Sequence, residues 1–300
     1  MRPPRLIATD LDGTVLLRDG TLSPRTLRAL RAAAAAGTGT VVVSARPTRS
    51  VRRVAAVNGL TGTAICGNGA VVCDLGSGAT LLSRPLDTAV ARDVAQALAD
   101  AVPGVAFAVE TGEQLLCTPR FTMRFEEPST IEVDVSGPQE LWACREPVLK
   151  LLAWSPTLDA DTLLAAADRA AAGRVQCTHS GGRGLVEITA AGVTKASTLA
   201  AWCASRGITA EEVVAFGDMP NDLPMLAWAG AGWAMGNAHP AVLAAVPRHT
   251  LSIGEDGVAA VLERLFTPEH TVAGAVTTGG AADADPAAAD GSPDPDKVGA

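Results

Sequence analysis

Residues 5–14 read Arg-Leu-Ile-Ala-Thr-Asp-Leu-Asp-Gly-Thr. The first half of this segment is a short β-prone run, and an acidic cluster that begins at Asp10 follows it directly. In open α/β sheets, ligands bind beyond the carboxyl ends of the strands. A strand that ends in carboxylates therefore predicts both an element of a sheet and one wall of a functional site.

The residues that follow alternate between helix and strand signals. Ser23-Pro24 is a typical helix start, with an N-cap residue and a proline in the first turn, and we expect the helix to end at Gly37. A β-branched strand over Thr40–Val43 and a helix over residues 47–58 come next. Alternating elements with short connections predict a parallel sheet with crossover helices. The continuous apolar strand suits a sheet that is covered on both faces.

The middle of the chain lacks this alternation, which resumes from residue 189. The elements expected in the middle are helices at 88–101 and 159–172, strands at 105–109, 115–117, 148–154, 175–179 and 185–189, and an irregular acidic stretch over 125–140. We therefore expect an α+β cap domain (residues 84–188) inserted into a Rossmann-like, doubly wound core domain. The core would consist of residues 1–83 and 189–266.

The last part of the chain contains two segments of different character. The elements expected in the first are helices at 194–206, 222–229 and 258–265 and strands at 213–216 and 231–234. From residue 267 onward the chain has no aromatic residue and consists largely of Ala, Gly, Asp, Pro, Thr and Ser. Such a composition buries too little apolar surface to offset the entropy lost on ordering. We expect residues 267–300 to be a disordered tail.

The composition limits the classes of function. The 300 residues include 24 basic and 32 acidic side chains, a formal net charge of −8, which disfavours binding to nucleic acid or to an anionic membrane. Met225–Gly236 is shorter than the ~20 residues that cross a bilayer, and Leu6–Thr9 is too short for a signal peptide. Six cysteines without a C-x-x-C pair indicate a reducing compartment. We expect a cytoplasmic protein, and the sequence leaves open whether it is a monomer or a homodimer.

Four short polar motifs each follow a predicted strand or begin a predicted helix. They are Asp10-x-Asp12-Gly13-Thr14, Ser44, Lys195 and Gly217-Asp218-x-x-Asn221-Asp222. Taken alone, each is more often a turn, a helix cap or a solvated lysine. If they converge at one edge of the sheet, several carboxylates, a hydroxyl and an ammonium group meet there. Carboxylates without histidine or cysteine partners form a hard-oxygen site that suits Mg²⁺.

Such a set fits phosphoryl transfer. A bound Mg²⁺ would keep one aspartate ionised as a nucleophile, whereas clustered buried carboxylates without a cation are driven toward protonation. The metal, a lysine and a hydroxyl could together neutralise the three equatorial oxygens of a phosphoryl group. Gly13 would let the backbone turn tightly and leave the following amides free to hold phosphate.

The four motifs resemble those of the haloacid dehalogenase (HAD) superfamily of phosphatases. Further segments narrow the resemblance to the Cof-type branch, subfamily IIB, whose C2B cap lies between the second and third motifs. These segments are Cys66-Gly-Asn68-Gly69-Ala70, Val186-Glu187-Ile188, Gly192-Val-Thr-Lys195-Ala196, Met225 and Met235-Gly-Asn237-Ala238. The match covers residues 5–266 in the expected order.

The resemblance implies a role for each matched residue. Asp10 would be the nucleophile, and Asp12 would protonate the leaving oxygen and then activate water. Ser44 and Lys195 would bind the transferring phosphoryl group. The implied Mg²⁺ site consists of Asp10, the backbone carbonyl of Asp12, and Asp218, with Asp222 supporting the metal. The further substrate- or phosphate-binding positions are Leu11, Gly13, Thr14, Ala45, Arg46, Asn68 and Asn221.

Several assignments stay open at this point. Asn68-Gly69 is equally a hairpin turn and a substrate loop, and Arg46 could reach substrate or pair with an acid on a helix face. Ser44-Ala45-Arg46 departs from the family's usual Thr-Gly-Arg, although serine keeps the hydroxyl. Arg120 and Arg124 are candidate cap cations for an anionic substrate.

The resulting hypothesis is a Mg²⁺-dependent phosphatase of small phosphorylated metabolites, such as sugar phosphates, that works through an aspartyl-phosphate intermediate. One alternative is a phosphomutase of the same superfamily, in which the phosphoryl group passes to a second hydroxyl. An alternative from another class is a metabolite sensor that keeps the pocket without turnover. The sequence gives no signal for the identity of the substrate.

Overall fold

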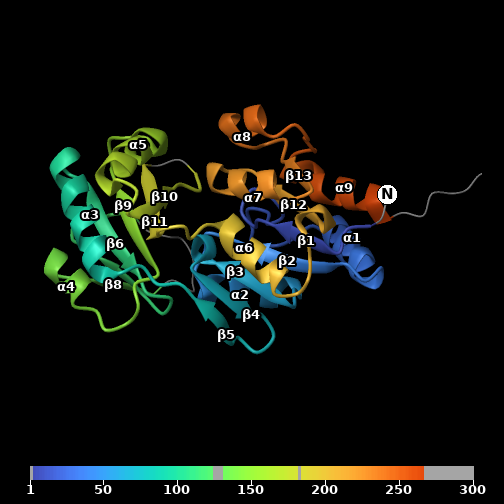
Figure 1. Cartoon of the computed structure of the whole chain (residues 1–300), viewed down its shortest axis with the longest axis horizontal. Coiled ribbons are helices and arrows are strands. Elements are labelled where there is room, and N and C mark those ends of the chain that lie inside the picture. Colours follow the sequence, from blue (N-terminus) through green and yellow to red (C-terminus); the bar gives the residue numbers. More distant parts are fainter. Residues whose placement is uncertain (1–2, 124–130, 182–183, 267–300) are drawn as a thin grey trace, which may run out of the picture. The chain divides into compact units, whose positions relative to one another are not determined.

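The computed structural model describes residues 3–123, 131–181 and 184–266. The predicted tail at 267–300 and Arg124 therefore lie outside the described residues. Within them the chain forms two sheets, one on each side of the predicted division into core and cap (Figure 1). The exact domain boundaries stay a prediction.

The first sheet has seven strands in the order β13-β12-β1-β2-β3-β4-β5. The strands are β1 (Leu6–Thr9), β2 (Gly39–Val43), β3 (Thr63–Cys66), β4 (Val71–Asp74), β5 (Thr80–Ser83), β12 (Val213–Gly217) and β13 (Ala231–Ala234). The five strands from β13 to β3 are parallel, and β4 and β5 extend the sheet in antiparallel fashion. The doubly wound α/β fold is confirmed, with an antiparallel edge added to it.

The helices of this core are α1 (Pro24–Ala35), α2 (Thr48–Asn58), α6 (Lys195–Ala204), α7 (Leu223–Trp228), α8 (Pro240–Ala245) and α9 (Gly257–Phe266). Ser23 caps α1 as its sequence predicts, because its side chain accepts a hydrogen bond from the amide of Thr26. Helix α1 packs against α9, and α6 packs against α7. Every residue of β1 and β12 is buried, which is the pattern of a sheet covered on both faces.

The second sheet belongs to the cap and has the order β10-β11-β9-β6-β7-β8. Its strands are β6 (Ala106–Glu110), β7 (Leu115–Cys117), β8 (Glu132–Asp134), β9 (Lys150–Trp154), β10 (Val175–Thr178) and β11 (Leu185–Ala190). All pairings are antiparallel except that of β7 with β8. Helices α3 (Thr88–Ala101) and α5 (Ala160–Ala171) pack together over the larger hydrophobic cluster of the cap, and a short helix, α4 (Pro138–Trp142), accompanies them.

Several parts of the chain, helix α8 among them, differ from the sequence-based expectation. Strands β3, β4 and β5 were not predicted, because glycines interrupt the segment between 59 and 78. The stretch expected to be irregular contains β8 and α4. Tertiary pairing overrides weak local propensity in both places.

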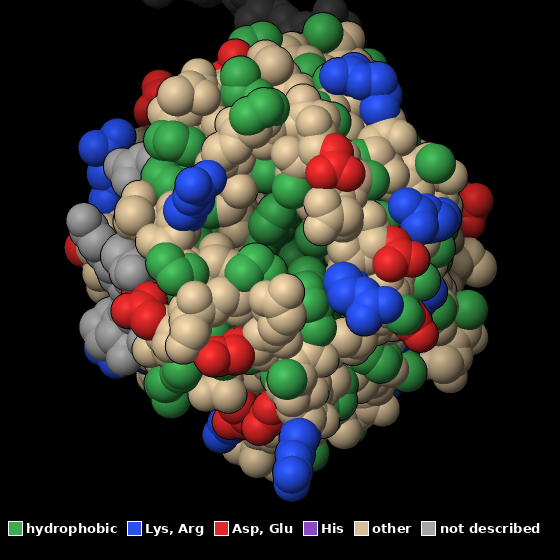
Figure 2. Space-filling view, turned by 90° about the vertical axis from the view of Figure 1, so that its left-hand side faces the viewer, with side chains coloured by type: hydrophobic (Ala, Val, Ile, Leu, Met, Phe, Trp, Pro, Cys, Tyr) green, Lys and Arg blue, Asp and Glu red, His purple; other side chains and the backbone are tan. Residues whose placement is uncertain are grey.

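The surface of the cap end is mixed in charge. Figure 2 shows lysine and arginine side chains interspersed with aspartate and glutamate on this face, and hydrophobic side chains visible between them. Among the coloured residues of this view, neither charge gathers into an extended patch. In the part of the chain that the structure describes, none of the helices combines the length and the apolar character needed to span a bilayer.

Candidate active site

Parallel pairing brings three strand ends to one edge of the core sheet. In β1, Thr9 lies opposite Phe216 of β12 and Val42 of β2. The residues that follow these strands, Asp10 and Asp218 among them, therefore emerge together at the carboxyl edge. The amide of Asp10 donates to the carbonyl of Phe216 at 3.1 Å, which fixes the chain where it leaves the strand. Distant motifs thus converge as the sequence predicts.

Lys195 lies at the start of α6 and joins two of these carboxylates. Its Nζ donates to Oδ1 of Asp10 and to Oδ1 of Asp222, each at 2.7 Å, and all three side chains are buried. Thr194 caps the helix through a capping box with Ser197, which holds the lysine at the first turn. Burial alone would lower the pKa of Lys195, but the two carboxylates raise it above the usual value. The lysine is therefore a fixed positive charge.

Asp222 organises the loop after β12. Its Oδ2 accepts hydrogen bonds from the backbone amides of Asp218 and Met219, both at 3.0 Å, while Oδ1 accepts from Lys195. Both oxygens of Asp222 are thereby used to position protein groups. This arrangement fits a residue that positions the groups around a metal ion rather than the main ligand of that ion.

The neighbouring carboxylates fit a hard divalent cation. Asp10, Asp218 and Asp222 each offer an oxygen, and these three atoms lie within 4.8 Å of one another. Burial raises the pKa of Asp10 well above 3.8 despite the opposing charge of Lys195, and burial with repulsion from Asp222 raises the pKa of Asp218 to about 7. Oδ1 of Asn221 is buried without a hydrogen-bond partner among the described residues. An all-oxygen set that carries more negative than positive charge is the donor set that Mg²⁺ prefers.

Gly13 lets Asp218 approach the first loop closely. Its φ is +76°, and a Cβ at this position would lie 2.1 Å from Oδ2 of Asp218. The amides of Thr14 and Val15 donate to the carbonyl of Leu11, which differs from the expectation that the amides after Gly13 are free for phosphate. The side chain of Leu11 is part of the hydrophobic core.

The side chain of Thr14 forms a hydrogen bond with the acidic cluster. Its hydroxyl donates to Oδ1 of Asp218 at 3.2 Å, and the residue is buried. Thr14 therefore supports a candidate metal ligand, whereas the sequence assigned it to phosphate.

The loop after β2 is tied to both the core and the cap. The buried Ser44 hydroxyl accepts a hydrogen bond from the amide of Arg46 at 3.1 Å. The carbonyl of Ala45 accepts one from Nζ of Lys150, on cap strand β9, at 2.9 Å. The guanidinium of Arg46 forms two 2.7 Å hydrogen bonds with the carboxylate of Asp12. Arg46 thus pairs with an acid, but the acid belongs to the first motif and not to a helix face.

Asn68 is both a turn residue and part of a buried network. It lies in the tight connection between β3 and β4 with φ +55°, which agrees with a hairpin turn. Its side chain donates to Glu187 of the cap at 3.1 Å and accepts from Asn221 of the core at 3.0 Å. Asn68 therefore connects the cap to the acidic cluster.

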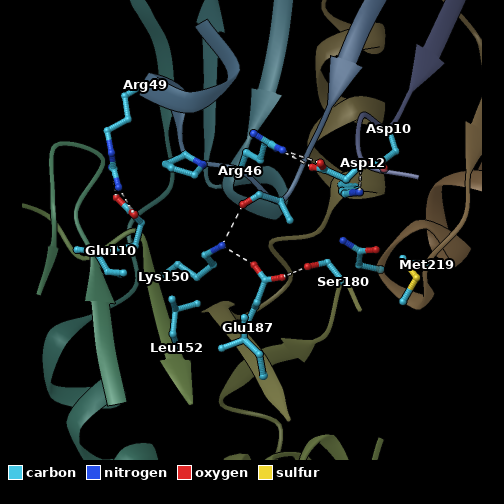
Figure 3. A pocket seen from close by; sticks show the side chains of 16 residues that line it. Asp10, Asp12, Arg46, Arg49, Glu110, Lys150, Leu152, Ser180, Glu187 and Met219 are labelled. Carbon is cyan, nitrogen blue, oxygen red and sulfur yellow. Dashed lines mark hydrogen bonds and ion pairs between the residues drawn. The ribbon is translucent and has the colours of Figure 1, made fainter. Parts of the chain in front are cut away.

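A cavity of about 240 Å³ opens between these groups and the cap sheet. Figure 3 shows the side chains that line it, with Asp10, Asp12 and Arg46 from the core and Lys150, Leu152 and Glu187 from the cap. Its lining residues are Asp10, Asp12, Ala45, Arg46, Pro47, Arg49, Glu110, Leu115, Lys150, Leu152, Ser180, Leu185, Glu187, Lys195, Met219 and Asn221. The cap thus supplies an apolar wall with a few polar groups above the carboxylates.

Several lining residues were not predicted from the sequence. Lys150 forms a buried ion pair with Glu187, which also accepts from the hydroxyl of Ser180. Arg49 of α2 pairs with Glu110 of β6 at 2.6 and 2.8 Å, joining core to cap. The sequence feature that could have identified Lys150 and Glu110 is a charged residue at one end of an otherwise apolar strand. The two strands read Lys-Leu-Leu-Ala-Trp and Ala-Phe-Ala-Val-Glu. Arg120, a predicted candidate, is exposed and does not line this cavity.

Comparisons with known proteins agree with this geometry. A family model described as haloacid dehalogenase-like hydrolase matches residues 7–262. The chain is 31% identical over 275 residues to a 5-amino-6-(5-phospho-D-ribitylamino)uracil phosphatase of Bacillus subtilis, covering 88% of this chain and 98% of the relative. It is 28% identical over 291 residues to a pyridoxal phosphate phosphatase of Escherichia coli, again covering 88% and 98%.

A solved structure has the same fold. A haloacid dehalogenase-like hydrolase from B. subtilis superposes with a TM-score of 0.76 at 25% identity, covering 87% of this chain and 99% of that one. The family model covers most of the chain, and the full-length relatives are phosphatases. The chain therefore belongs to the haloacid dehalogenase-like hydrolase family, as one of its phosphatases.

Proposed function

We propose that this chain is a Mg²⁺-dependent phosphatase that hydrolyses phosphate monoesters of small metabolites through a phosphorylated Asp10. The observation that carries the proposal is the bridge from Lys195 to Asp10 and Asp222, with Asp218 beside them. Lys195 and Asp10 also line the cavity. Three carboxylates and one ammonium group leave the site short of positive charge. A divalent cation would supply the missing positive charge.

Asp10, Asp218 and the backbone carbonyl of Asp12 would hold the metal, with Asp222 behind them. When bound, Mg²⁺ supplies positive charge that keeps the carboxylates ionised and stabilises charge on the phosphoryl oxygens. Lys195 donates to the nucleophilic carboxylate and is close enough to share a phosphoryl oxygen. Ser44 lies in the neighbouring loop, where its hydroxyl could donate to another.

The reaction would have two steps. An Asp10 oxygen attacks phosphorus, the bond to the leaving oxygen breaks, and that oxygen takes the proton of the Asp12 carboxyl group. Water then attacks phosphorus of the acyl phosphate and gives its proton to the Asp12 carboxylate. This step releases inorganic phosphate and regenerates Asp10.

The cavity supports a substrate with a compact, partly apolar leaving group. Leu115, Leu152 and Leu185 form the apolar wall of the cap, and Lys150 and Glu187 supply polar groups beside it. The two curated relatives are named for phosphate esters that carry a nitrogen heterocycle. We therefore propose such esters as substrates to test first, together with sugar phosphates.

Phosphate release by the purified chain tests the proposal. We expect inorganic phosphate from a panel of phosphorylated metabolites with Mg²⁺, and none after chelation. Asp10→Asn should abolish turnover, whereas Asp19→Asn, an exposed aspartate in the same connection, should not. An isomeric phosphate ester as product would indicate a mutase, and binding without turnover by the unmodified chain would indicate a sensor. Either result would contradict the proposed hydrolysis.

A further inference from the structure

The half-exposed carboxylate of Asp12 is held by a rigid guanidinium fork. Nε and Nη2 of Arg46 each donate to one oxygen of Asp12 at 2.7 Å, and Figure 3 shows the two side chains meeting at the edge of the cavity. The side chain of Asp12 is 52% exposed and that of Arg46 is 26% exposed. A bidentate pair fixes the plane as well as the position of a carboxylate, which a single contact cannot do.

Arg46 is itself anchored at both ends. Its amide donates to the Ser44 hydroxyl at 3.1 Å, and its carbonyl accepts from the amide of Gly67 at 2.9 Å. At the far end, Nη1 donates to the buried hydroxyl of Ser50 in α2 at 3.1 Å. The guanidinium is therefore fixed relative to the sheet, and it transmits that rigidity to Asp12.

We propose that Arg46 is a positioning residue that acts on the reaction through Asp12, and that it is not primarily a ligand of the phosphoryl group. The inference rests on the proposed function, in which Asp12 transfers the proton to the leaving oxygen. An aspartate half exposed to water would otherwise sample several side-chain rotamers. Proton transfer needs the carboxyl oxygen within hydrogen-bond reach of the leaving oxygen.

The alternative is that Arg46 contacts the transferring phosphoryl group directly. In that case its contribution would be made to every substrate alike, because all phosphate monoesters share this group. A contribution made through Asp12 matters only where the leaving oxygen requires a proton. The two roles therefore differ in how the effect of a substitution depends on the leaving group.

The test compares two aryl esters at saturating Mg²⁺. Phenyl phosphate has a poor leaving group that requires protonation, whereas para-nitrophenyl phosphate has a good one that does not. For Arg46→Lys, which keeps the charge and loses the fork, we expect kcat/KM for phenyl phosphate to fall about 10- to 100-fold, since acid–base catalysis contributes about 10²–10⁴. For para-nitrophenyl phosphate we expect a change within about threefold.

Four further variants make the test specific. Asp12→Asn should show the same dependence on the leaving group, and adding Arg46→Lys to it should reduce kcat/KM for phenyl phosphate by no more than about twofold, because the two residues act as a unit. Ser50→Ala removes one anchor of the guanidinium and leaves Asp12 unchanged. It should lower kcat/KM a few-fold for phenyl phosphate and not for para-nitrophenyl phosphate. Arg53→Lys, an exposed arginine of the same helix, is the matched control and should change neither ester.

The outcomes separate the two proposals. An equal loss for both esters in Arg46→Lys, or losses that multiply in the double variant, would show that Arg46 acts on the phosphoryl group and would overturn the inference. If Asp12→Asn itself lacks the dependence on the leaving group, the proton-transfer role in the proposed function fails instead. If Arg46→Lys does not fold, as judged by its thermal unfolding, the Ser50→Ala comparison decides in the same way.

Discussion

Gly13 illustrates how closely the first loop and Asp218 approach each other. Any side chain at this position would collide with a carboxylate oxygen, since a Cβ would lie 2.1 Å from it. The family motif therefore has a packing reason beyond a tight turn. The hydroxyl of Thr14 holds the same carboxylate from its other oxygen.

We expect Gly13→Ala to weaken metal binding selectively. Displacing Asp218 should raise the Mg²⁺ concentration for half-maximal activity by about 10-fold or more, the range seen when groups behind metal ligands are disturbed. Gly20→Ala is the matched control, because Gly20 also has a positive φ, +81°, but has nothing within 4 Å of its added Cβ. In both variants, backbone strain lowers the free energy of unfolding by roughly 1–2 kcal/mol. Titrating Mg²⁺ into the phosphatase assay of both variants checks this, and equal Mg²⁺ requirements would contradict the role of Gly13.

At the scale of elements, a short ion pair joins a cap strand to a core helix. Arg49 near the start of α2 reaches Glu110 at the end of β6, and both side chains are largely buried. Arg49 also donates to the carbonyl of Gly112 at 2.9 Å, in the turn that follows β6. This contact secures one side of the cavity.

Glu110→Gln should therefore destabilise the closed arrangement of cap and core. The positive charge of Arg49 would lose the facing carboxylate of Glu110 in a site largely shielded from water, which costs roughly 1–3 kcal/mol. We expect a lower thermal unfolding midpoint and a higher KM, both measured beside Glu113→Gln. Glu113 is an exposed residue of the same turn. Identical behaviour of the two variants would mean that the pair does not hold the cap.

The sequence predicted the parallel strands β1, β2, β12 and β13 and the converging acidic motifs, since short apolar runs mark these strands and charged residues follow β1 and β12. It did not reveal β3–β5, because the register of four-residue strands is set by their neighbours and not by their own pattern. Nor did it reveal that Arg46 binds Asp12 or that Lys150 reaches the carbonyl of Ala45. These contacts join residues 34 and 105 positions apart, and only the tertiary structure defines them.

At the scale of the whole molecule, stability should depend on both Mg²⁺ and pH. In the folded protein without metal, burial and the charge of Asp222 raise the pKa of Asp218 from its usual value of 3.8 to about 7. A raised folded-state pKa stabilises the protein at low pH, and this stabilisation is lost as pH rises through the folded value. Mg²⁺ replaces the proton, so its own stabilisation grows over the same range.

Thermal unfolding with and without Mg²⁺ measures this coupling. The rise in Tm caused by Mg²⁺ should be small near about pH 5 and largest near about pH 8. Asp218→Asn should flatten this dependence, because the titrating group is removed. A metal-induced rise that is equal at both pH values in the unmodified protein would contradict a site built around Asp218.

The covalent step can be trapped by separating the two roles of Asp12. Asp12→Asn should still be phosphorylated by para-nitrophenyl phosphate, whose leaving group needs no proton, but it should lack the base that activates water. Acid quenching followed by peptide mapping should then place a phosphoryl group on Asp10, after a burst of one nitrophenol per active site. Steady turnover without a burst, or a phosphoryl group on any other residue, would contradict Asp10 as the nucleophile.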